Sequence, residues 1–365
     1  MAVAERHEYY AATGLPNERG RKLTNMLAKG VKNKRFAATV LIGAALIGTA
    51  LASSALLGTR TGPAERSGSD RRSKPPTPPP AAERIVATIA VGRRPGSIVA
   101  GEGAVWVKNH ADQTVSRIAP ETNTVTATIP IGAGEFGYLA AGEGSVWATN
   151  NDANTVSRID PHTNAVQATI PVGENPQGIA VGSGSVWVAN HRAGSVSRID
   201  PGTNRVSEVI ASNELCCSPQ AVATSPGAVW VTVPDTGKQH LVRIDPATNR
   251  VVATVAVGEN GGRLAVMEDA VWAATNTMTV AKIDPATNSV VSRVDAGAIV
   301  FGAAAGLGSI WVTSPGESLV RIDPAGNRVV GELRIPGAVF PTVGATAVWV
   351  SSETTNSVVR VEPFP

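Results

Sequence analysis

Two histidines are the residues best placed to do chemistry. His110 and His191 each follow a short apolar stretch that contains a tryptophan, at the start of a polar loop. An imidazole in such a loop can act as a general base or as a metal ligand. Asp152 lies in the corresponding loop between them along the chain. These three residues are the catalytic candidates for a lyase or hydrolase that uses a divalent metal. Because their spacing implies no further ligand, we instead expect surface histidines, no bound metal and no cofactor.

A second group of side chains suits binding better than bond breaking. Tyr138, Arg263 and Phe340 occupy the same position in three copies of a repeated unit, described below. The loops near this position add further polar and aromatic side chains, namely Arg93, Glu135, Phe136, Gln177 and Gln220. Variable loops on a rigid scaffold often carry binding residues. The set predicts a face that binds a peptide, glycan or protein, and the alternative is an ordinary solvated loop surface.

Cys216 and Cys217 are adjacent in the longest of these loops, residues 211–219. In an oxidising compartment two neighbouring thiols can close a vicinal disulfide, whose strain makes it labile. Two separate thiols, or a contact with a soft metal, are the alternatives. The vicinal disulfide is therefore one of three hypotheses for this loop.

The elements that must position these residues are repeated strands. The seven tryptophans are Trp106, Trp147, Trp187, Trp230, Trp272, Trp311 and Trp349. Their successive spacings are 41, 40, 43, 42, 39 and 38 residues. A period near 40 residues with short strands indicates a propeller or solenoid. Since the tryptophans share one position in the repeat, we expect them to form the core between repeats.

The unit at 177–217 shows the pattern of one repeat. Strands are expected at 177–181, 185–190, 195–200 and 205–210, joined by short turns. The last turn reads Pro-Gly-Thr-Asn, in which proline presets φ and asparagine tolerates the left-handed conformation. Apolar residues on both sides of the tryptophan indicate a strand that is covered on both faces. Four antiparallel strands of this kind make one blade.

Closure of the ring is visible at the two ends of the repeat region. The final unit stops after its third strand, near residue 362, while residues 84–91 resemble the fourth strand of the other units. Residues 84–91 should therefore complete the last blade, which removes the open edges. The predicted fold is all-β, a seven-bladed propeller of four-stranded antiparallel blades over 84–365.

The segment before the propeller has a membrane-protein pattern. Residues 36–58 contain no charge, and 23 residues of helix are long enough to cross a bilayer. Residues 1–35 are basic, which predicts a cytoplasmic tail, a single-pass transmembrane helix and a propeller outside the cell membrane. Residues 59–83 form a Pro-rich linker. The alternative is secretion after signal cleavage near Ala52.

The net charge of +3 is unevenly distributed. Residues 1–83 hold 13 of the 32 basic and 6 of the 29 acidic residues, so the propeller region has 19 and 23. The propeller is therefore slightly acidic, and no nucleic-acid partner is expected.

The repeats resemble the YVTN-repeat, or YncE-like, propellers. The motif is seen in the stretches 147–150 and 187–190, with tryptophan in place of tyrosine. The same repeat is similar to that of the virginiamycin B lyase-like propellers, which implies seven blades and, for that activity, a divalent metal with a Glu and His set. Where those repeats typically place Glu after the tryptophan strand, this chain has Asn109, Asn150, Asn190 or Ser314. That departure favours binding over lyase activity.

Three functional hypotheses follow from the sequence. The preferred one is a membrane-anchored extracytoplasmic propeller that acts as a binding or scaffold module. The second is a metal-dependent lyase or hydrolase resembling virginiamycin B lyase. The third is a sensor that relays a signal to a cytoplasmic partner through residues 1–35.

Overall fold

A computed structural model describes residues 84–363, apart from 133, 135, 217, 236–237, 259–261, 268 and 276. The chain divides into two units, Met1–Pro76 and Thr77–Pro365, and the described residues lie in the second. The predicted tail, transmembrane helix, cleavage position and linker all fall outside the described residues, as do Glu135 and Cys217. These features stay predictions. Within the described part, no helix is both long and apolar enough to span a bilayer.

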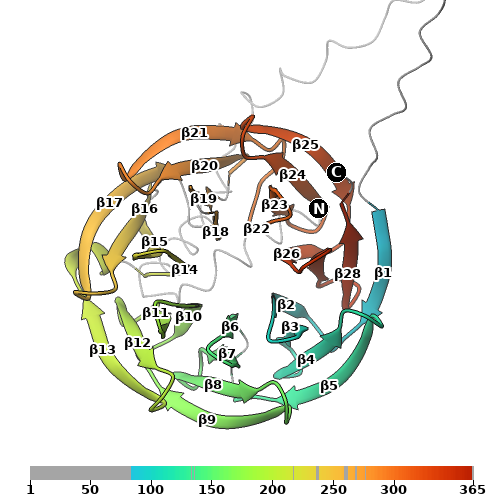
Figure 1. The fold of residues 1–365 in the computed structure, drawn as a ribbon, viewed down its shortest axis with the longest axis horizontal. Coiled ribbons are helices and arrows are strands. Elements are labelled where there is room, and N and C mark those ends of the chain that lie inside the picture. The colour runs from blue at the N-terminus through green and yellow to red at the C-terminus, as the bar shows by residue number, and fades with distance from the viewer. Residues whose placement is uncertain are drawn as a thin grey trace, which may run out of the picture. The chain divides into compact units, whose positions relative to one another are not determined.

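The described strands form seven antiparallel four-stranded sheets arranged as the blades of a closed ring (Figure 1). Blades 1 to 4 contain β2(Pro95–Gly101), β3(Ala104–Asn109), β4(Thr114–Ala119), β5(Thr124–Pro130); β6(Leu139–Gly142), β7(Ser145–Asn150), β8(Thr155–Asp160), β9(Ala165–Pro171); β10(Pro176–Gly182), β11(Ser185–Asn190), β12(Ser195–Asp200), β13(Arg205–Ala211); and β14(Val222–Ser225), β15(Ala228–Asp235), β16(Lys238–Asp245), β17(Arg250–Gly258). Blades 5 to 7 contain β18(Leu264–Val266), β19(Val271–Ala274), β20(Thr279–Asp284), β21(Ser289–Asp295); β22(Gly302–Gly306), β23(Ser309–Ser314), β24(Ser318–Asp323), β25(Arg328–Arg334); and β26(Ala338–Val343), β27(Val348–Ser352), β28(Ser357–Glu362), β1(Arg84–Ala90). The predicted all-β, seven-bladed fold is confirmed. One short 3₁₀ helix, η1(Asn213–Leu215), lies in the loop before β14.

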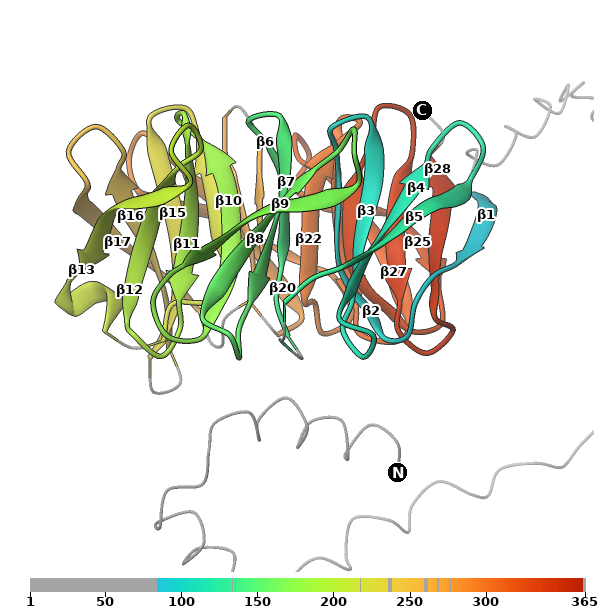
Figure 2. The ribbon, with the colours of Figure 1, turned by 90° about the horizontal axis from the view of Figure 1, so that it is seen from below.

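We name the strands of each blade A to D from the centre of the ring outward. Strands A line the centre and strands D form the rim (Figure 1). Loops emerge on the two flat faces of the ring (Figure 2). The variable face carries the D–A and B–C loops, such as residues 91–94 and 110–113. The turn face carries the A–B and C–D turns, such as residues 102–103 and 120–123.

All seven tryptophans are at most 2% exposed and pack between blades. Trp187 of blade 3, for example, shares a core cluster with Val229 and Val231 of blade 4. Its indole nitrogen donates to the carbonyl of Gly182 at 3.0 Å, which satisfies the polar end of a buried aromatic ring. The prediction that the tryptophans form the core between blades is confirmed.

In blades 2, 3, 4, 5 and 7 a basic side chain on strand C donates a hydrogen bond to the C–D turn of the next blade. Arg198 lies over the Trp187 ring at 4.9 Å. It also donates to the carbonyl of Pro246 at 2.8 Å and to Oδ1 of Asn249 at 2.9 Å, both in the C–D turn of blade 4. Asn249 has φ +57°, the left-handed conformation that asparagine tolerates in turns. The predicted turn residues thus also act as hydrogen-bond acceptors for the preceding blade.

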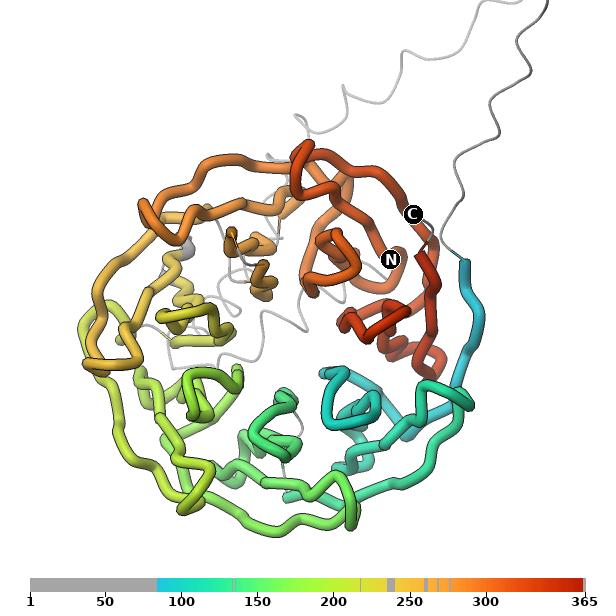
Figure 3. The backbone as a smooth tube through the Cα atoms, viewed as in Figure 1, coloured from blue at the N-terminus to red at the C-terminus, as the bar shows by residue number. Residues whose placement is uncertain are grey.

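The ring closes as the sequence predicts. β1 pairs antiparallel with β28, with Arg84 opposite Glu362 and Ala90 opposite Ser357. Figure 3 shows the blue first strand beside the red last strand. Arg360 of β28 in turn donates to Pro120 and Asn123 of blade 1 at 3.0 Å. Both the final sheet and the contact to the first blade therefore depend on residues far apart in the sequence.

Candidate functional site

Residues at the start of the A strands, or just before it, surround the central channel near the variable face. They combine with the next strand residues to line a cavity of about 110 Å³, to which all seven blades contribute. Its lining is Ser97, Ile98, Tyr138, Leu139, Gly178, Ile179, Ala221, Val222, Arg263, Leu264, Ala303, Phe340 and Pro341. Arg263 is the only charged residue among them. The predicted trio of Tyr138, Arg263 and Phe340 is therefore brought together in one site.

Arg263 is surrounded by aromatic rings from other blades. Its guanidinium carbon lies 3.6 Å from the ring centroid of Tyr138, 5.3 Å from that of Phe340 and 5.8 Å from that of Phe301. The Phe340 ring meets the Tyr138 ring edge-on at 5.8 Å and lies tilted by 45° to the Phe301 ring at 5.3 Å. We call these four side chains the channel cluster. Cation–π attraction to the ring faces holds the Arg263 charge in place.

The charge of Arg263 has no carboxylate partner in the described part of the chain. Its Nε is buried and has no hydrogen-bond partner. Burial lowers the pKa of Arg263 to about 9, so the side chain remains a cation at neutral pH. The residue as a whole is half-buried. Since a charge that is partly removed from water and has no hydrogen-bonded counter-ion is costly, this arginine is a strong candidate for a ligand contact.

Lys108 is a buried cation that the sequence analysis did not select. Its side chain is fully buried, and Nζ donates to the carbonyls of Thr149 at 2.6 Å and Phe136 at 3.4 Å. Burial lowers its pKa to about 7, against an opposing effect of the Asp152 charge. The sequence did contain a signal. Lys108 stands two residues after its tryptophan, where the other blades have small neutral residues, namely Thr149, Ala189, Thr232, Ala274, Thr313 and Ser351.

His110 lies beside Lys108 near the end of the channel that opens on the variable face, which we call the mouth. Its ring fills the space above Gly96, where an added Cβ would come within 2.2 Å of Cε1, and it meets Phe136 edge-on at 6.0 Å. Burial and the charges of Lys108, Arg94 and Arg263 lower the pKa of His110 to about 3, although the Gly137 backbone acts in the opposite sense. His110 is therefore neutral at physiological pH, and its Nε2 is buried without a hydrogen-bond partner.

The two predicted catalytic histidines have different surroundings. The pKa of His191 is lowered mainly by burial, and its nearest backbone partners are Pro219 and Ser218 of the D–A loop before blade 4. Neither histidine is among the groups that shift the pKa of the other. Asp152 is exposed and acts electrostatically on Lys108. Asp152 acts on Lys108 and Lys108 acts on His110, whereas His191 lies against the D–A loop before blade 4.

The described residues at the mouth do not fit the metal centre that the family resemblance implies. Among them, no group of three or more His, Cys, Asp or Glu side chains could hold a metal ion. The groups that act electrostatically on His110 are the cations Lys108, Arg94 and Arg263. Positive charge around the imidazole opposes a divalent cation and favours an anion.

The remaining predicted binding residues are spread over the variable face. The backbone N–H and the side-chain Nε of Arg93 each donate to the Asp112 carboxylate at 2.6 Å, and these two hydrogen bonds, the backbone one first, lower the pKa of Asp112. Phe136 lies 5.9 Å from the guanidinium of Arg94. Gln177 and Gln220 are half-buried, and their backbone carbonyls accept hydrogen bonds from Thr149 and Gly178 of other blades.

The predicted vicinal disulfide cannot be placed, because only one of its cysteines is described. Cys216 is exposed at the end of η1. The disulfide therefore stays a prediction.

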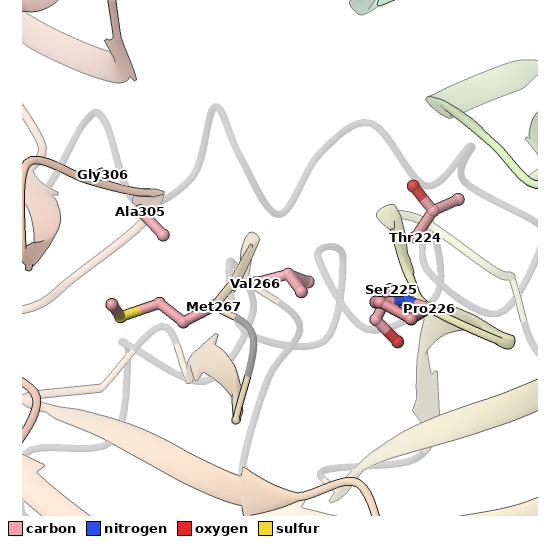
Figure 4. A pocket seen from close by; sticks show the side chains of 7 residues that line it. All are labelled: Thr224, Ser225, Pro226, Val266, Met267, Ala305 and Gly306. Carbon is pink, nitrogen blue, oxygen red and sulfur yellow. The ribbon is translucent and has the colours of Figure 1, made fainter. Parts of the chain in front are cut away.

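The turn face has a depression of its own, about 370 Å³ in volume and open to solvent. Val266 and Met267 of blade 5 lie between Thr224–Pro226 of blade 4 and Ala305–Gly306 of blade 6 (Figure 4). It is larger than the channel cavity, but its lining has no charged residue. We place the candidate site in the channel, since convergent polar groups rather than volume identify a binding site.

The sequence profile of the virginiamycin B lyase family matches residues 86–283, more than half of the chain. The chain belongs to this family. A comparison with curated proteins gave no match. The family assignment confirms the resemblance to virginiamycin B lyase-like propellers that the repeats suggested.

Solved structures show the same fold at low sequence identity. Hydrazine synthase from Kuenenia stuttgartiensis is 16% identical with a TM-score of 0.66, over 74% of this chain and 95% of that chain. The selenomethionine-substituted virginiamycin B lyase from Staphylococcus aureus is 17% identical with a TM-score of 0.65, over 77% of this chain and 100% of that chain. At these identities the likeness establishes the propeller and not the activity.

Proposed function

We propose that this member of the virginiamycin B lyase family is a binding module that holds a peptide, glycan or protein ligand on its variable face. The observation that carries the proposal is the channel cluster. It gathers a cation and three aromatic rings from four different blades, of which Arg263, Tyr138 and Phe340 line the cavity at the centre of the ring. Aromatic and arginine side chains are the residue types that dominate binding energy at such sites.

The family's lyase activity is the second candidate function, and the family match is the observation that favours it. Against it, the buried imidazole nearest the channel stands among cations, and the described residues include no metal-binding group. If the protein were a lyase with His110 or His191 as its general base, alanine at that histidine would abolish the reaction.

Placement of the propeller outside the cell membrane, on an anchor at 36–58, is part of the proposal and rests on the sequence alone. A sensor function, in which residues 1–35 contact a cytoplasmic partner, also rests on the sequence alone. Binding of the isolated tail to a cytoplasmic partner would favour the sensor function.

The binding proposal is tested with the full-length protein on peptide and glycan arrays. The test variant combines Tyr138→Ala, Arg263→Gln and Phe340→Leu. Leucine is chosen because Phe340 is only 8% exposed and alanine there would cost about 3–5 kcal/mol of stability. We expect ligands of the wild-type protein to lose binding to the triple variant, while Arg192→Gln, an exposed change on the same face, keeps it.

Retained binding by a folded triple variant would place the ligand elsewhere. Conversion of virginiamycin B by the wild-type protein with Mg²⁺, lost on chelation and in His110→Ala, would make the protein an enzyme and overturn the proposal.

A further inference from the structure

We infer that the group recognised in the channel is a carboxylate on a short apolar chain, which enters the cavity and pairs with the Arg263 guanidinium. The inference rests on the proposed function and names the chemistry of its ligand. It is drawn from the charge balance, the lining and the volume of the channel cavity.

The charge balance favours an anion. The described side chains around the cavity include no acidic group that could neutralise Arg263. The channel cluster offers the guanidinium three ring faces, and rings do not provide the oxygen lone pairs that five N–H donors require. A carboxylate matches the planar fork of an arginine with two parallel hydrogen bonds.

Other cations reinforce the preference for an anion. The charges of Lys108, Arg94 and Arg263 each act on His110 in the same direction, so their fields overlap at the mouth. Arg94 is partly neutralised by Glu353 at 3.1 Å. Lys108 donates to the backbone carbonyls of Phe136 and Thr149, and Asp152, which acts on it, is exposed. An anion entering the channel would therefore meet net positive potential.

The lining and the volume limit what accompanies the carboxylate. Beyond Arg263, the cavity wall is formed mainly by aliphatic side chains, including Ile98, Leu139, Ile179 and Val222. A phosphate dianion would need several further donors that this wall lacks. At about 110 Å³ the cavity holds the volume of roughly three to four water molecules at ~30 Å³ each. Acetate or propionate, or the end of a longer chain, has this size.

The test uses propionate and its neutral analogue propionamide with the full-length protein in isothermal titration calorimetry. We expect propionate to bind in the millimolar range and propionamide to bind at least about tenfold more weakly, because the charge-assisted bonds to Arg263 are lost. Arg263→Gln should weaken propionate by a similar factor. Arg263→Lys should recover part of the affinity, since it restores the charge without the planar fork. The matched control Arg192→Gln should bind as the wild type does.

Equal binding of propionate and propionamide, or unchanged propionate binding in Arg263→Gln, would overturn the inference. Neither result would bear on the array test, in which the triple variant loses the ligands of the wild-type protein. Failure of this inference and failure of the proposed function can therefore be distinguished. If Arg263→Gln unfolds, a crystal of the wild-type protein soaked in propionate gives the same decision. Density beside the guanidinium supports the inference, and density only elsewhere contradicts it.

Discussion

At the scale of single residues, two cationic groups distinguish this ring from a purely structural repeat. Arg263 and Lys108 occupy positions at which most other blades carry small or neutral side chains. Lys108 is fully buried and Arg263 is half-buried, and burial lowers the pKa of each. Repeat packing alone requires neither charge, because Thr149 and Thr313 fill the Lys108 position of their blades with hydrogen-bonded hydroxyl groups.

Lys108 should make stability depend on pH. Its pKa is about 7 in the folded protein, below the ordinary lysine value of 10.5, so between these values the unfolded chain binds the proton and the folded protein does not. The contribution of Lys108 to the free energy of unfolding therefore rises with pH across this window and does not change below it. Relative to Lys108→Met, the wild-type free energy of unfolding should rise by up to about 4 kcal/mol from pH 7 to 10.5.

Urea unfolding of both proteins at several pH values measures this difference. Loss of the hydrogen bonds to Thr149 and Phe136 changes the free energy of unfolding of the variant by an amount that does not depend on pH. Parallel stability curves for the two proteins would show that Lys108 keeps an ordinary pKa.

At the scale of the element, two strands of a blade stabilise it in different ways. Strand B supplies the buried tryptophan, and strand C supplies the basic residue that covers the indole and reaches the next C–D turn. The pairing repeats as Arg158 with Trp147 and as Arg243 with Trp230. Strand A, by contrast, bears the residues that vary at the channel, so binding and stability are assigned to different strands.

The strand C arginine should be a measurable part of blade-to-blade stability. Arg198→Gln removes the cation–π contact with Trp187 and the hydrogen bonds to Pro246 and Asn249. We expect a loss of about 1–3 kcal/mol, measured by denaturant unfolding. Arg205→Gln, on the exposed rim strand β13, should change stability by less than about 0.5 kcal/mol. Equal effects of the two changes would contradict the assigned role.

At the scale of the whole molecule, closure converts seven similar sheets into one ring. The last sheet needs β1, which buries Ile89 in the core beside Val358 and covers the free edge of β28. A repeat protein gains its stability from neighbour contacts, and here the last blade also contacts the first through Arg360.

Deletion of residues 84–91 should therefore be far more harmful than its length suggests. We expect loss of a cooperative thermal transition, together with aggregation, because β28 becomes an exposed edge. Deletion of the eight residues 66–73 in the predicted linker is the control of equal length. Size-exclusion chromatography and calorimetry compare the two, and a monomeric, cooperative protein without β1 would contradict this account of closure.

The ring could be predicted from the amino-acid sequence. The spacing of the tryptophans, the paired apolar positions and the spare strand at 84–91 predicted blades, core and closure, because repeat packing is local and depends on neighbouring residues only. The sequence also indicated Tyr138, Arg263 and Phe340 as one position of the repeat. Only the tertiary structure decided that Arg263 reaches Tyr138 and Phe340 across the channel, and that His110 and His191 lie in separate surroundings. Those distances depend on how far long side chains extend into a shared central space, and on which neighbouring blades leave that space open with glycine, alanine or serine.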